Sequence, residues 1–195
     1  MLVWIVGHSF VKWAGKHAGS AHYGKDLGMS QFGVTVTWQG KSGMLWGELR
    51  AVLNGMRRGG TCPDVLVIHL GENDLVREKS LAIVKAMKED LRDIGRFWSG
   101  TYIMWCVWMP RRAWRGARRP AAIDKARKKM NREMKKFCQE KRMGLIENPE
   151  IAYVDKGFFR QDGVHLSRLG LECYIFRIRE AVAEALGVDT WPKGI

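Results

Sequence analysis

The sequence has few cysteines, few prolines and no long hydrophobic run. Its 195 residues include four cysteines and five prolines. The cysteines at positions 62, 106, 138 and 173 are widely spaced and form no C-x-x-C, which argues against a zinc site and against a disulfide framework. The longest apolar stretches hold about six to eight residues, whereas a membrane-spanning helix needs roughly 20. We therefore expect buried thiols in a reducing compartment and no membrane span.

The N-terminal segment lacks the features of a secretory signal. Leu2 to Val6 follow Met1 directly, without a basic leader, and Gly7-His8 interrupts the apolar run early. We expect an intracellular protein, in the cytoplasm or the nucleus. A length of 195 residues with 46% hydrophobic residues suits one domain over 1–195, and no linker or repeat divides it.

Acidic residues are scarce, and the scarcity is local. The whole chain has 33 Lys and Arg against 20 Asp and Glu, while residues 111–142 hold 14 basic and three acidic residues. Such a stretch attracts nucleic acid, anionic lipid or an acidic partner, although it is also typical of a solvated helix face. The candidate polyanion-binding residues are Arg111, Arg112, Arg115, Arg118, Arg119, Lys128, Lys129 and Arg132.

Apolar runs alternate with helical patterns along the chain. Strands are predicted over 2–6, 34–38, 65–70, 102–109 and 144–147. Helices are predicted from near His8, over 44–56, from Ser80 as N-cap, along an apolar stripe at 126–138, and over 171–186 before Gly187. Near-continuous apolar strands are typical of a parallel sheet buried on both faces. The expected fold is α/β, a three-layer α/β/α sandwich around a mostly parallel five-stranded sheet.

Four short motifs carry the groups that acyl-transfer chemistry needs. They are Gly7-His8-Ser9, Gly40-Lys41-Ser42-Gly43, Gly71-Glu72-Asn73-Asp74 and Asp162-Gly163-Val164-His165. The first three follow predicted strands, and ligands bind at the carboxyl ends of such strands. Ser9 can act as nucleophile, His165 as its base, and Asp162 can orient the histidine.

With these motifs the chain resembles the SGNH hydrolases, also called the GDSL esterase/lipase family. The resemblance maps the family's four residues to Ser9, Gly40, Asn73 and His165, and implies an oxyanion hole formed by Ser9, Gly40 and Asn73. A basic esterase of this size is also similar to the esterase-like domains of certain transposable-element proteins. The resemblance departs at His8, where the family has Asp. We do not expect His8 to be the base, and expect it to influence substrate binding.

Each motif alone has an ordinary explanation. Ser9 could be a helix N-cap, Asn73-Asp74 an Asx turn, and Asp162 with His165 a loop pair. A P-loop is rejected because Thr35 stands where its first glycine is required. His17, His22 and His69 have no metal spacing, and His69 is expected in the core or the cleft. No metal and no cofactor are therefore expected.

The motifs together predict a serine esterase that hydrolyses a small ester, acetyl or short-acyl, through an acyl-enzyme. The alternative is a nucleic-acid-binding module on the same scaffold that uses residues 111–142. The sequence leaves the acyl and alcohol groups and the oligomeric state open.

Overall fold

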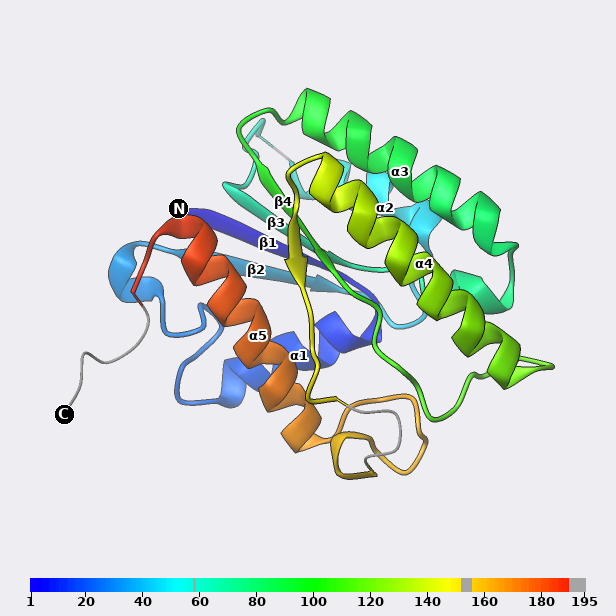
Figure 1. Cartoon of the computed structure of the whole chain (residues 1–195). Coiled ribbons are helices and arrows are strands. Elements are labelled where there is room, and N and C mark those ends of the chain that lie inside the picture. Colours follow the sequence, from blue (N-terminus) through cyan, green and yellow to red (C-terminus); the bar gives the residue numbers. More distant parts are fainter. Residues whose placement is uncertain (58, 152–155, 190–195) are drawn as a thin grey trace.

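The computed structural model describes residues 1–57, 59–151 and 156–189. Its centre is a parallel five-stranded sheet with the strand order β2-β1-β3-β4-β5 (Figure 1). The strands are β1 (Leu2–Gly7), β2 (Thr35–Gly40), β3 (Val65–His69), β4 (Tyr102–Cys106) and β5 (Gly144–Ile146). The predicted α/β class and parallel sheet are thus confirmed.

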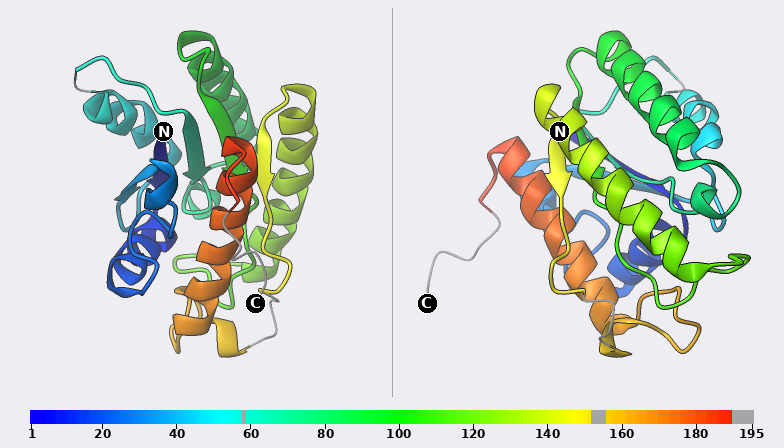
Figure 2. Two further views of the ribbon diagram at one scale, coloured as in Figure 1. Left: turned by 90° about the vertical axis from the view of Figure 1, so that its left-hand side faces the viewer. Right: turned by 45° about the vertical axis from the view of Figure 1, so that its right-hand side comes forward.

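Helices cover both faces of the sheet, as Figures 1 and 2 show. The helices are α1 (Ser9–Ser20), α2 (Leu49–Met56), α3 (Ser80–Phe97), α4 (Pro120–Glu140) and α5 (Arg168–Leu186). One face carries α1 and α5, and the other carries α2, α3 and α4. None of the helices in the described part of the chain is long and apolar enough to cross a membrane.

Successive side chains along a strand point to opposite faces of the sheet and so belong to two separate hydrophobic cores. On β1, Val3 and Ile5 pack under α1 and α5, whereas Trp4 and Val6 pack under α2, α3 and α4. All four side chains are buried. Burial on both faces explains why the strands are continuous apolar runs without polar alternation.

The structure corrects several predicted boundaries. Ser80 is the first residue of α3, and the N-cap is Lys79, so Ser80 is not the cap. The predicted helix over 44–56 begins as the 3-10 turn Trp46–Glu48 and becomes α2 only at Leu49. The fourth strand ends at Cys106 rather than at residue 109. All four cysteines are free, and two of them are only half-buried.

The register of the sheet brings three sequence-distant strand ends together. Gly7 of β1 pairs with Gly40 of β2 on one side and with His69 of β3 on the other. The strand order reverses at β1, which is the point where open α/β sheets form their ligand crevice. The segments that follow these three strands therefore meet at one edge.

Candidate active site

Ser9 stands at the first position of α1, directly after β1. The N-cap of this helix is His8, whose Nδ1 accepts the backbone N–H of Phe10 at 3.3 Å. The hydroxyl of Ser9 is thereby free from capping, and the ordinary explanation for a serine after a strand does not apply. Ser9 lies at the positive end of the helix dipole, where a developing negative charge is favoured.

His165 and Asp162 form a hydrogen-bonded pair in the segment before α5. Nδ1 of His165 lies 2.6 Å from Oδ2 of Asp162. The other carboxylate oxygen accepts the backbone N–H groups of Val164 and His165, both at 2.9 Å. Partial burial raises the pKa of Asp162, but these N–H groups and the His165 ring outweigh it and lower the pKa to about 2. An ionised Asp162 only accepts, so Nδ1 of His165 carries the proton and Nε2 is left to act as a base.

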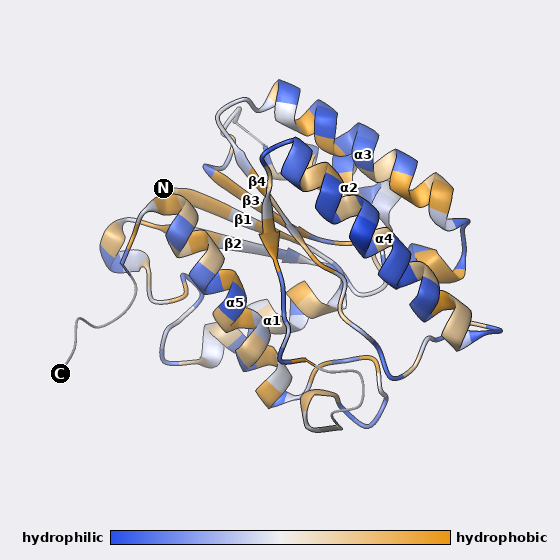
Figure 3. Ribbon diagram, in the orientation of Figure 1, coloured by the Kyte–Doolittle hydropathy of each residue, from blue (hydrophilic) through white to orange (hydrophobic). Residues whose placement is uncertain are grey.

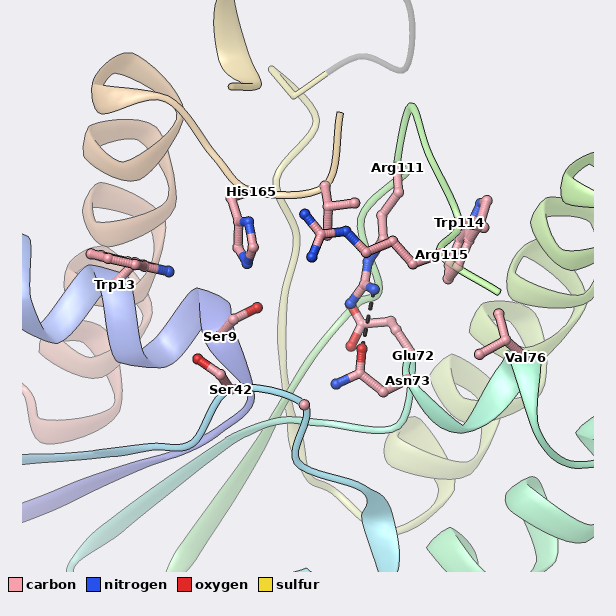
Figure 4. Close-up of a pocket in the computed structure, with 12 residues that line it drawn as sticks. Ser9, Trp13, Ser42, Glu72, Asn73, Val76, Arg111, Trp114, Arg115 and His165 are labelled. Atoms are coloured by element: carbon pink, nitrogen blue, oxygen red, sulfur yellow. Dashed lines mark hydrogen bonds between the residues drawn. The ribbon is translucent and has the colours of Figure 1, made fainter. Parts of the chain in front are cut away.

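Ser9 and His165 line the same pocket, and Figure 4 shows them on one side of it, with Asn73 and Arg111 across from them. The pocket has a volume of about 280 Å³ and is also lined by Trp13 and Trp114. No hydrogen bond joins Ser9 Oγ to His165 among the residues that the structure describes. In this structure the hydrogen bond between His165 and Asp162 is thus formed, whereas the one between Ser9 and His165 is not.

Asn73 reaches the same pocket from the loop after β3. Its Nδ2 donates to the backbone carbonyl of Met44 at 3.0 Å, and its Oδ1 accepts from Nη1 of Arg111 at 3.2 Å. Its side chain caps no backbone amide of the turn that follows, so the Asx-turn alternative does not hold. The neighbouring Asp74 accepts the N–H of Trp46 and ties the segment after β2 to this loop.

The structure places Gly40 outside this pocket. A Cβ at Gly40 would lie 2.2 Å from the backbone nitrogen of Lys12, so the glycine permits close contact between β2 and α1. Gly43, three residues later, lines the pocket and has a left-handed φ of +73°. Gly40 is thus not among the residues that line the pocket, whereas Gly43 lines it together with Ser9, and a part for Gly40 in an oxyanion hole stays a prediction.

Below Ser9 lies a buried polar chain that includes His8. Nε2 of His8 is 2.5 Å from Oε2 of Glu72, and Nε2 of His69 is 2.9 Å from Oε1. Nδ1 of His69 is 2.7 Å from the hydroxyl of Tyr174 on α5. His8, His69 and Tyr174 are fully buried. His69 is therefore a core histidine. His8 is buried and is not among the residues that line the pocket, although the sequence suggested that it would influence substrate binding.

Of the pair formed by His8 and Glu72, it is Glu72 that carries a charge. Since Nδ1 of His8 accepts a backbone N–H, its proton lies on Nε2 and is donated to Glu72. Burial lowers the pKa of His8 to about 4, against the opposing charge of Glu72. Burial raises the pKa of Glu72, but its electrostatic interactions and hydrogen bonds with the rings of His8 and His69 hold it well below its usual value.

The same residues are the candidates for a metal site. Among the described residues, ligand atoms of His8, His69 and Glu72 lie within 4.8 Å of one another. Hydrogen bonds within the chain already engage each of these atoms. The arrangement is that of a satisfied polar network.

The basic stretch divides into two parts. The sequence placed Arg111 among the candidates for polyanion binding, but Arg111 is buried and lines the pocket, so it does not belong to an exposed basic surface. Arg115 is exposed and lies 3.3 Å from Oδ2 of Asp162. The remaining candidates are exposed on the loop before α4 or on α4 itself, which Figure 3 shows as strongly hydrophilic: Arg112, Arg118, Arg119, Lys128, Lys129 and Arg132.

The sequence did not predict that Arg111, Gly43 and Glu72 line the same pocket as Ser9. Arg111 was hidden in a basic run, and only its position directly after Pro110, at the end of the predicted fourth strand, set it apart. Glu72 was within the Gly71–Asp74 motif, but its partner His8 could not be assigned without the strand register.

No protein-family model and no curated protein matches the sequence. Solved structures with the same fold do exist. A GDSL-like lipase from Bacteroides thetaiotaomicron matches over 94% of this chain and 88% of its own, with a TM-score of 0.72 and 13% identity. The Clostridium thermocellum family 3 carbohydrate esterase matches over 96% and 97%, with a TM-score of 0.72 and 17% identity.

A mutant acetyl esterase with an acetate ion is a third such neighbour. It matches over 96% of this chain and 98% of its own, with a TM-score of 0.72 and 14% identity. These neighbours agree with the family resemblance of the four motifs. The chain therefore has the fold of the GDSL-like lipases and carbohydrate esterases.

Proposed function

We propose that the protein is a serine esterase in which Ser9 is the nucleophile, His165 the base and Asp162 the residue that orients it. The observation that carries the proposal is that the hydrogen-bonded His165–Asp162 pair brings His165 into the same pocket as Ser9, with the capping of α1 left to His8. The ester-hydrolysing names of the structural neighbours favour the same chemistry.

In the first half-reaction, Ser9 Oγ attacks the ester carbonyl while its proton passes to Nε2 of His165. Asp162 stabilises the imidazolium through Nδ1–H. The tetrahedral intermediate collapses, His165 returns the proton to the leaving alcohol, and an acyl-Ser9 ester remains. Because apo enzymes often hold these contacts loosely, we expect the Ser9–His165 hydrogen bond to form with substrate bound.

In the second half-reaction, water takes the place of the alcohol. His165 accepts a proton from water, the hydroxyl oxygen attacks the acyl carbon, and the proton then returns to Ser9 Oγ as the acid leaves. The oxyanion of both intermediates is stabilised by the backbone N–H of Ser9, by Nδ2 of Asn73 and, in place of Gly40, by the backbone N–H of Gly43.

The pocket favours a small acyl group. Its volume of about 280 Å³ lies at the low end of ligand pockets, and Trp13 and Trp114 add apolar walls. An acetyl or short-acyl ester therefore fits the proposal.

Turnover of p-nitrophenyl acetate tests the function. We expect Ser9→Ala to lower kcat at least about a thousandfold, since a triad nucleophile is removed. Ser42→Ala is a matched control because Ser42 also lines the pocket with a hydroxyl, which is 3.2 Å from Nζ of Lys12. Equal activity of wild type and Ser9→Ala, or an equal loss in both variants, would overturn the proposal.

A second candidate function is polyanion binding by α4, and the observation in its favour is a stripe of exposed side chains. Lys125, Lys129, Arg132 and Lys136 recur at helical spacing on α4 and have no ion pair with another described residue. Unpaired basic side chains along one face attract a phosphate backbone with a strong dependence on salt.

Fluorescence anisotropy with a labelled single-stranded RNA tests this binding. Replacing Lys125, Lys129 and Arg132 by Gln should weaken binding at least about tenfold and reduce its salt dependence. The control replaces Lys25, Arg57 and Lys79, which are exposed elsewhere, and makes the same change in net charge. If both triple variants weaken RNA binding equally, the effect is one of net charge alone, and α4 is not the binding site.

A further inference from the structure

The side-chain amide of Asn73 is held at both ends by partners of opposite kind. The guanidinium of Arg111 donates to Oδ1 at 3.2 Å, and the carbonyl of Met44 accepts from Nδ2 at 3.0 Å. A guanidinium can only donate and a carbonyl can only accept. A flipped amide would place donor against donor and acceptor against acceptor. The orientation of Asn73 is therefore fixed, and one Nδ2 hydrogen is left for a ligand.

Arg111 is itself held rigidly in the wall of the pocket. It is only 6% exposed, and its guanidinium carbon lies 5.4 Å from the ring centre of Phe10 and 5.1 Å from that of Trp114. Figure 4 shows its guanidinium beside Glu72 and Asn73, with the dashed hydrogen bond to Asn73. Two aromatic rings and one amide therefore fix the plane of the guanidinium.

The position of Arg111 is costly for folding. Its Nε is buried without a hydrogen-bond partner, and burial lowers the pKa of its guanidinium against the opposing charge of Glu72. An unsatisfied buried donor on a charged group costs folding free energy. The buried arginine therefore indicates a role other than stability.

We propose that Arg111 is a positioning residue for the oxyanion hole. It fixes the amide of Asn73 with Nδ2 toward the reacting carbonyl, and it places a positive charge behind that donor. A cationic donor at Oδ1 also polarises the amide and makes Nδ2–H a stronger donor. The inference rests on the proposed esterase function, because Asn73 needs an oxyanion to stabilise.

Steady-state kinetics of four proteins test the inference: wild type, Arg111→Met, Asn73→Ala and the double variant. Loss of one oxyanion donor lowers kcat by roughly 100-fold or more, and Arg111→Met should cost a substantial part of that with KM nearly unchanged. In the Asn73→Ala background the same change should cost little, because the two residues act through one donor.

Two outcomes would overturn the inference. One is a kcat of Arg111→Met equal to that of wild type. The other is independent losses that multiply fully in the double variant. Failure of the esterase proposal is recognised separately, because wild type and Ser9→Ala would then turn over substrate equally.

A chemical rescue separates positioning from folding. Guanidinium ion, added at concentrations that do not unfold the protein, should raise kcat of Arg111→Ala several-fold but leave Arg111→Ala/Asn73→Ala unchanged. Thermal unfolding identifies variants that do not fold. If Arg111→Met does not fold, Arg111→Lys takes its place in the double-mutant cycle with Asn73→Ala. In that cycle too, losses of kcat that multiply fully in the double variant would overturn the inference.

Discussion

At the residue scale, the departure at His8 has a partner in Glu72. The resemblance expects Asp at position 8, and the chain instead has a neutral histidine that donates to a buried carboxylate. His8 still caps α1 through Nδ1, a task that Asp also performs well. The two residues differ in charge: a neutral histidine can donate to the buried Glu72, whereas the carboxylate of an Asp would repel it.

The substitution His8→Asp should destabilise the protein, although it restores the residue that the family resemblance expects. The new carboxylate would face that of Glu72 where both side chains are buried, and the two cannot both ionise without cost. We expect the free energy of unfolding to fall by about 3 kcal/mol in urea titrations. His8→Asn keeps a capping side chain without charge and should lose less.

A second substitution checks the cause. Glu72→Gln in the His8→Asp background removes the like charge, and it should recover part of the lost stability. If His8→Asp is as stable as the wild type, or if Glu72→Gln brings no recovery, charge repulsion is not the reason.

At the element scale, the crossing of β2 over α1 depends on Gly40. A Cβ there would meet the nitrogen and Cα of Lys12 at 2.2 and 2.4 Å, and backbone cannot yield as a flexible side chain does. At Gly43 a Cβ would meet nothing within 4 Å, but the φ of +73° is unfavourable for other residues. The two glycines of one motif are thus required for different reasons.

Alanine at these two positions should separate packing from catalysis. Gly40→Ala should cost about 2–3 kcal/mol of stability, while the folded fraction retains most of its kcat. Gly43→Ala should cost roughly 1–2 kcal/mol and lower kcat, because a strained backbone moves the proposed amide donor. Urea titration and esterase assays on both variants check this. A fully active Gly43→Ala would contradict the expected displacement of that amide.

The elements and the core could largely be predicted from the sequence. The apolar runs at 2–6 and 65–70 coincide with β1 and β3 to within a residue, because burial on both faces leaves an unambiguous pattern. Contacts across the chain could not be predicted in this way. Strand register and loop path, rather than periodicity, decide which glycine of residues 40–43 lines the pocket of Ser9. They also decide that Arg111 donates to Asn73.

At the scale of the whole molecule, the buried chain makes folding stability depend on pH. His8 has a pKa of about 4 in the folded protein, below its usual 6.5, so the folded state resists a proton that the unfolded chain accepts. The resulting stability is present above pH 6.5 and is lost as the pH falls toward 4. The lowered pKa of Glu72 extends the loss to more acidic conditions.

The free energy of unfolding should therefore fall by about 3 kcal/mol between pH 6.5 and pH 4 because of His8. Urea titrations over this range measure it, and the difference between wild type and His8→Asn isolates it from the other histidines. Parallel pH profiles for the two proteins would contradict the assignment.

The reciprocal fit of His8 and Glu72 has a consequence for descent. A substitution at either position alone leaves a buried polar group without its partner, so we expect the two positions to change together although 64 residues separate them. Relatives with Asp at the first position are then expected to carry a side chain other than Glu at the second. A search pattern that requires His at the first position together with Glu at the second would find chains that lack the family's Asp.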